Sequence, residues 1–137
     1  MKKKILSALL SIAMVASLLV GCGGSDAAST SAGGGENGLV GVAMPTKDLQ
    51  RWNQDGANMK SELEAAGYSV DLQYASNDVA TQVSQIENMI SSGVDVLVVA
   101  SIDGSSLGTV MSQAKEAGIP VIAYDRLIMD SDAVSYY

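Results

Sequence analysis

Three glycines recur at almost equal intervals in the second half of the sequence, and each lies between a helical pattern and a strand pattern. They are Gly67, Gly93 and Gly118, which are 26 and 25 residues apart. Glycine fits the left-handed backbone conformation that ends many helices, and the interval matches the length of one helix–strand unit. A repeat of this kind predicts an α/β domain built on a parallel sheet.

The segments around these glycines carry the periodicities that such a fold needs. Apolar residues recur at helical spacing in three segments, which are Trp52, Met59, Leu63 and Ala66, then Val79, Val83, Ile86 and Ile90, and then Leu107, Val110, Met111 and Ala114. Strands are predicted at 39–44, 69–74, 95–100 and 121–125, and a fifth is predicted to start at 134–137.

The composition of the strands predicts their order in the sheet. Segments 39–44 and 96–100 are apolar throughout, as strands covered on both faces must be, whereas 68–74 alternates apolar and polar residues like an edge strand. The order 2-1-3-4-5 follows, which is the flavodoxin-like arrangement of a three-layer, doubly wound sheet. Right-handed crossovers place the first helix on one face and the second and third on the other. One face is then under-covered, so we expect the chain to be truncated after residue 137.

The N-terminal residues are typical of an export signal. Lysines at 2–4 precede an apolar run at 5–20, which ends just before Cys22, the only cysteine. Such a run is a signal peptide, and it is shorter than the ~20 residues of a permanent membrane helix. The segment ending at Cys22 resembles the lipobox of bacterial lipoproteins, in which the cysteine receives a diacylglycerol and becomes the new N-terminus. The alternative is a free cysteine buried as a small hydrophobe. The expected organisation is a lipoprotein signal peptide at 1–21, a Gly/Ser-rich tether at 22–38 and a folded domain at 39–137.

Charge and residue inventory argue against several classes of function. The net charge is −7 at pH 7, and removal of the N-terminal lysines would leave five basic against 15 acidic residues, which repels nucleic acid. The sequence has no histidine and one cysteine, so Ser-His and Cys-His catalysis and ordinary zinc sites are excluded within these residues. The loop before the first predicted helix lacks G-x-G-x-x-G and P-loop patterns. We therefore expect a protein that is not an enzyme, with no nucleic-acid partner, no metal and no cofactor.

Polar residues follow the predicted strands at the edge where open parallel sheets bind ligands. Arg51 with Trp52, and Asp125 with Arg126, offer paired hydrogen-bonding groups and a flat aromatic face, which suit a neutral sugar. Lys47, Asp103 and these two pairs are the candidate site residues.

Five of the six candidates also have a plainer interpretation. Trp52 lies on the apolar stripe of the first predicted helix and would fit the core, and Asp125 with Arg126 would fit a surface ion pair. Lys47 would be a solvated loop residue, and Asp103 would be the N-cap of the third helix.

Residues 39–137 resemble the first lobe of ribose-binding-like periplasmic proteins, in the xylose-binding and multiple-monosaccharide-binding subgroup. The matching strings lie at 41–46, 51–52, 85–89, 93–97, 101–104 and 123–127, and the most specific are Arg51-Trp52 and Tyr124-Asp125-Arg126. The resemblance implies a two-lobed fold that closes over a sugar, with Arg51 and Trp52 contacting and stacking on it and with Asp125 and Arg126 bonding its oxygens.

The same resemblance implies a function, a location and partners. The protein would bind a monosaccharide of the xylose, glucose or galactose type and deliver it to an ABC transporter permease. It would be extracytoplasmic and held at the membrane by lipid on Cys22. Two alternatives stay open: a sugar-sensing receptor that docks on a chemoreceptor or sensor kinase, and an enzyme whose catalytic groups lie beyond residue 137.

Overall fold

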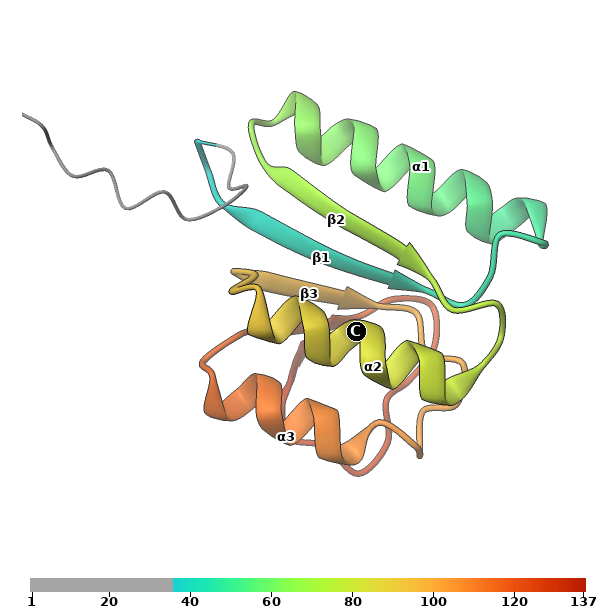
Figure 1. The fold of residues 1–137 in the computed structure, drawn as a ribbon, viewed down its shortest axis with the longest axis vertical. Coiled ribbons are helices and arrows are strands. Elements are labelled where there is room, and N and C mark those ends of the chain that lie inside the picture. Colours follow the sequence, from blue (N-terminus) through green and yellow to red (C-terminus); the bar gives the residue numbers. More distant parts are fainter. Residues whose placement is uncertain (1–35) are drawn as a thin grey trace, which may run out of the picture. The chain divides into compact units, whose positions relative to one another are not determined.

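A computed structural model describes residues 36–137. The expected signal peptide, Cys22 and most of the expected tether lie outside the described residues. The elements, in chain order, are β1 (Leu39–Met44), α1 (Gln50–Ala65), β2 (Ser69–Tyr74), α2 (Val79–Ser91), β3 (Val96–Val99), α3 (Gly108–Glu116), β4 (Val121–Ala123) and β5 (Val134–Tyr136) (Figure 1).

The five strands form one parallel sheet in the order β2-β1-β3-β4-β5. Val42 of β1 is aligned with Leu72 of β2 on one side and with Val98 of β3 on the other. The order predicted from strand composition is therefore confirmed. The alternating segment forms the edge strand β2, and the apolar segments form the inner strands β1 and β3.

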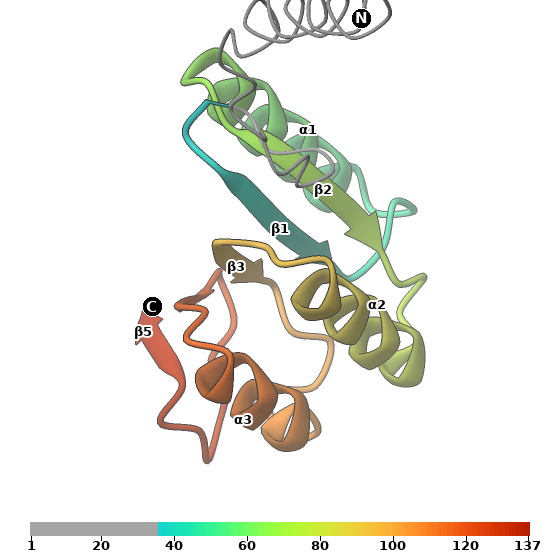
Figure 2. The same cartoon turned by 60° about the vertical axis from the view of Figure 1, so that its left-hand side comes forward.

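The helices divide unequally between the two faces of the sheet, as Figures 1 and 2 show. On one face, α1 packs Trp52 against the strand residues Val42 and Val98. On the other face, α2 and α3 bury a larger apolar cluster that includes Ile86 and Met111. This division confirms the arrangement predicted from right-handed crossovers.

Helix ends follow the local chemistry of the sequence. Gly67, Gly93 and Gly118 have φ values of 89°, 76° and 72°, so each adopts the left-handed conformation expected of it after a helix. At the start of α2, the Asp78 carboxylate accepts a hydrogen bond from the backbone N–H of Thr81 at 2.6 Å. Hydrogen bonding by Thr81, first through its side chain and then through this backbone N–H, lowers the pKa of Asp78.

The fourth strand ends earlier than predicted. β4 stops at Ala123 instead of continuing to Asp125, because Asp125 has a φ of 62° and the Arg126 N–H donates to the Tyr124 carbonyl at 2.7 Å. A left-handed residue cannot continue a strand. Asp125 and Arg126 therefore lie in a turn beyond the end of the sheet.

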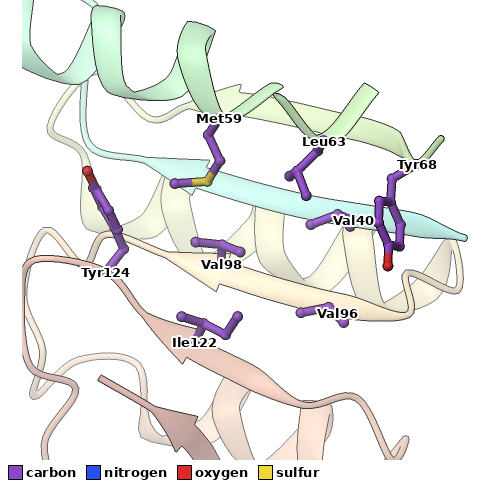
Figure 3. Close-up of a pocket in the computed structure, with 8 residues that line it drawn as sticks. All are labelled: Val40, Met59, Leu63, Tyr68, Val96, Val98, Ile122 and Tyr124. Atoms are coloured by element: carbon purple, nitrogen blue, oxygen red, sulfur yellow. The ribbon is translucent and has the colours of Figure 1, made fainter. Parts of the chain in front are cut away.

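The face that carries α1 is only partly covered. A groove of about 380 Å³ runs between α1 and the sheet, and its walls are Val40, Met59, Leu63, Tyr68, Val96, Val98, Ile122 and Tyr124 (Figure 3). The expected under-covered face is thus present. In the part of the chain that the structure describes, no helix has the length and apolar character to cross a bilayer.

Candidate functional site

Four of the predicted site residues meet at the carboxyl edge of the sheet. Arg51 and Trp52 come from the first turn of α1, and Asp125 and Arg126 from the turn after β4. The guanidinium carbons of Arg51 and Arg126 lie 4.8 and 5.1 Å from the centre of the Trp52 ring, and Arg51 forms a hydrogen-bonded ion pair with Asp125. We name these four residues the carboxyl-edge cluster.

Trp52 is a buried member of this cluster. Its side chain is only 3% exposed and packs with Val40, Val42 and Met44 in the core under α1. The core interpretation of Trp52 is therefore correct, and two guanidinium groups also lie over its ring, where cation–π attraction favours them. Stacking of the indole on a sugar stays a prediction.

The Arg51 guanidinium pairs with two carboxylates, those of Asp55 and Asp125. Its Nε lies 3.5 Å from the Asp55 carboxylate one turn further along α1, and that carboxylate accepts a hydrogen bond of 3.2 Å from the Tyr124 hydroxyl. The hydrogen bond with Asp125 raises the pKa of Arg51, while burial, and then the bond to Asp55, raise the pKa of Tyr124. Asp55 was missed by the sequence analysis. The available clue was its position four residues after Arg51.

Arg126 is held against the loop between β3 and α3. Its Nη1 donates to the carbonyl oxygens of Ser101 at 3.0 Å and Ile102 at 3.5 Å. Both bonds use the same nitrogen, whereas a guanidinium carries five N–H donors on three nitrogens. The arrangement suits a side chain that is anchored at one corner and presents its other donors to a ligand.

Asp103 lies in the same loop and bonds to its own neighbours. Its carboxylate accepts from the Ser105 hydroxyl at 2.7 Å, the Ser105 N–H at 3.0 Å and the Ser106 hydroxyl at 2.7 Å. These bonds, above all the one from the Ser105 hydroxyl, lower the pKa of Asp103. Because α3 begins at Gly108 after Leu107 at the N-cap, the interpretation of Asp103 as that N-cap is wrong. Its sugar-binding role stays a prediction.

Lys47 lies at a different place on the carboxyl edge. Its ammonium is 5.0 Å from the centre of the Tyr74 ring, and it lines a polar hollow of about 370 Å³ beside the edge strand. Asp48, Gln73 and Gln85 line the same hollow. The structure thus places Lys47 over Tyr74, whereas the carboxyl-edge cluster is centred on Trp52.

The site offers donors and acceptors for hydrogen bonds. Among residues 36–137, no three His, Cys, Asp or Glu side chains come together in a way that would hold a metal ion. The carboxyl-edge cluster instead combines two guanidinium groups, a carboxylate in a turn and a buried aromatic support. Such groups can bind the hydroxyls of a polar, uncharged molecule.

The chain is similar to known proteins in both sequence and fold. Residues 40–137 match the family described as periplasmic binding protein domain. The multiple sugar-binding periplasmic receptor ChvE of Rhizobium radiobacter is 54% identical over 102 residues, which cover 74% of this chain and 29% of the receptor. The D-xylose-binding periplasmic protein of Escherichia coli K12 is 43% identical over 98 residues, which cover 72% of this chain and 29% of that protein.

Solved structures have the same architecture. An ABC transporter solute binding protein from Clostridium phytofermentans, with bound β-D-glucose, superimposes with a TM-score of 0.70 and 78% identity over 72% of this chain and 31% of its own. A carbohydrate transporter solute binding protein from Chloroflexus aurantiacus, in complex with D-glucose, has a TM-score of 0.66 and 38% identity, over 71% of this chain and 29% of its own. The chain spans less than a third of the length of each of these proteins.

Proposed function

The chain belongs to the periplasmic binding protein domain family, and we propose that it forms the first lobe of an extracytoplasmic protein that binds a monosaccharide for an ABC transporter permease. The parallel order β2-β1-β3-β4-β5 agrees with this family. The relatives described above are a multiple sugar-binding receptor, a D-xylose-binding protein and glucose-bound solute binding proteins. A glucose- or xylose-type sugar is therefore the proposed ligand.

The observation that carries the proposal is the carboxyl-edge cluster itself. Arg126 is anchored by one nitrogen to the loop after β3, and Asp125 projects from a left-handed turn beside it. An arginine and a carboxylate side by side give donors and an acceptor to adjacent hydroxyls of a sugar, and bonds to charged groups are the stronger ones. The second lobe would supply the remaining bonds and exclude water by closing.

The proposal extends to the N-terminal residues. A signal peptide at 1–21 would export the chain, and lipid on Cys22 would hold it at the membrane. A tether at 22–38 would separate the folded domain from the membrane. The sixteen residues at 23–38 would reach about 20–25 Å if they behave as a random coil. That length is enough to keep the folded domain clear of the membrane surface.

Removing the Arg126 side chain tests the proposed site. In the full-length protein, Arg126→Ala should weaken sugar binding by about tenfold to several hundredfold, because hydrogen bonds from a charged group contribute about 1.5–3 kcal/mol each. Lys47→Ala should cost clearly less, because Lys47 lies over Tyr74 in the neighbouring hollow. Calorimetric titration of both variants with xylose, glucose and galactose, after a check of their melting temperatures, measures the difference. Equal losses, or a larger one at Lys47, would mean that the sugar is bound elsewhere on the edge.

A further inference from the structure

Gln82 is a polar side chain that is completely buried in α2. It is 0% exposed, and the next turn of the helix places Ile86 in the apolar cluster between α2 and the sheet. A buried amide is unfavourable unless its donor and its acceptor both have partners. The partners of Gln82 therefore indicate why a polar residue occupies this position.

Both ends of the Gln82 amide bind the backbone of the loop after β3. Its Nε2 donates to the Ala100 carbonyl at 3.0 Å, and its Oε1 accepts from the Ile102 N–H at 2.9 Å. These two groups flank Ser101, which is 1% exposed. The amide therefore fixes the peptide units on both sides of Ser101 at the point where the strand has ended and the loop begins.

Ser101 is the residue whose carbonyl holds Arg126. Arg126 Nη1 donates to that carbonyl at 3.0 Å, and the same guanidinium lies 5.1 Å from the centre of the Trp52 ring. The contacts form a continuous path from Gln82 in α2, through the peptide units around Ser101, to Arg126. A rotation of these peptide units would turn the Ser101 carbonyl away from the guanidinium.

We propose that Gln82 is a positioning residue for Arg126, and that it sets the orientation in which the guanidinium meets a ligand. This effect on ligand binding rests on the proposed function, whereas the effect on Arg126 does not. Glutamine is suited to the task because it offers a donor and an acceptor at once. Leucine would leave both loop groups without a partner, and an ionised glutamate would turn a carboxylate oxygen toward the Ala100 carbonyl.

A matched pair of variants on one helix tests the proposal. Gln82→Leu removes the two hydrogen bonds of the Gln82 amide to the loop after β3. Gln85→Leu removes a similar bond, from Gln85 Nε2 to the Tyr74 carbonyl at 3.1 Å. Trp52 is the only tryptophan among residues 1–137, so the fluorescence of this 137-residue chain reports on the guanidinium beside it. Gln82→Leu should change the Trp52 emission in the same direction as Arg126→Ala, and Gln85→Leu should leave it unchanged.

Sugar affinity in the full-length protein gives the second readout. Gln82→Leu should weaken binding by about tenfold, and adding it to Arg126→Ala should cause little further loss, because both changes remove the same interaction. Gln82→Glu should bind poorly at neutral pH and recover as the glutamate is protonated at lower pH, since the acid form again offers a donor and an acceptor. This variant keeps the test open if Gln82→Leu does not fold.

Two results would overturn the positioning role. One is an unchanged Trp52 emission in a folded Gln82→Leu variant. The other is independent losses from Gln82→Leu and Arg126→Ala that multiply in the double variant. If the parent protein binds no monosaccharide, the proposed function fails, but the fluorescence comparison still decides whether Gln82 positions Arg126.

Discussion

Gly104 lies where the loops after β3 and β4 are in contact, and Gly104→Ala should loosen the site. A methyl group at this position would lie 2.2 Å from the Leu127 carbonyl oxygen, where ordinary contact begins at 3.4 Å. The overlap is about 1.2 Å. The atom in the way is backbone, so it cannot swing aside as the tip of a side chain can. The turn at 126–129 must move instead, and with it the bond from the Met129 N–H to the Gly104 carbonyl at 3.0 Å.

The expected size of the effect comes from two opposing contributions. Overpacking of this kind costs about 1–3 kcal/mol, and replacement of glycine by alanine recovers about 0.4–1 kcal/mol by restricting the unfolded chain. At the midpoints of these ranges, the free energy of unfolding should therefore fall by about 1.3 kcal/mol. For a domain of this size, each kcal/mol lowers the melting temperature by about 4–8 °C.

Gly108→Ala is the matched control. Gly108 is the first residue of α3. Apart from its chain neighbours and the backbone of its own helix, no atom of the described residues lies within 4 Å of the position that its Cβ would take. This change should leave stability equal or slightly higher. Of these two glycines, which are four residues apart, only Gly104 should therefore lose stability when it is replaced by alanine. Thermal and urea unfolding of both variants measures this. A Gly104→Ala variant as stable as the Gly108→Ala variant would refute the close approach of the two loops.

Two further changes test the packing of α1 and the proposed lipid anchor. A methyl group on Gly56 would lie 2.4 Å from the Tyr74 hydroxyl oxygen. Gly56→Ala should therefore lack the stabilisation of about 1 kcal/mol that alanine normally gives a helix. Part of this stabilisation should appear in the double variant, in which Tyr74→Phe removes that oxygen. Urea midpoints of the single and double variants decide this, and a full gain in the single variant would contradict it. Cys22→Ser should release or misprocess the exported protein, because serine has no thiol to receive the lipid. Detergent partitioning measures the change, and mature protein that stays in the membrane fraction would show that the anchor is elsewhere.

Most of the fold could be predicted because its determinants are local. Gly67, Gly93 and Gly118 mark the helix ends through backbone conformation alone, and the alternation in β2 reflects its place at the sheet edge. The end of β4 could not be predicted in this way. Asp125 reads as a strand residue in sequence, but its left-handed turn places it against Arg51, which is 74 residues away along the chain.

Part of the candidate site could also be predicted, because local sequence motifs identify some of its residues. Motif and strand position identified Arg51, Trp52, Asp125 and Arg126, which the structure brings together. The sequence offered two interpretations of Trp52 as alternatives, and its burial settles the question of packing. Hydrogen bonds between residues of distant elements leave no periodic pattern in the sequence, so they could not be predicted. The Tyr124–Asp55 hydrogen bond joins residues that are 69 positions apart, and the Gln82–Ala100 hydrogen bond joins residues that are 18 positions apart.

The most direct test of the central claim is a calorimetric titration of the full-length protein and of residues 23–137, each with D-glucose and D-xylose. The full-length protein should bind at least one of these sugars saturably. Residues 23–137 should bind them only weakly, because a single lobe leaves one side of the sugar in water, where each hydrogen bond contributes little. Tight binding by residues 23–137 alone would contradict the two-lobed mechanism, and absence of monosaccharide binding by the folded full-length protein would contradict the proposed function.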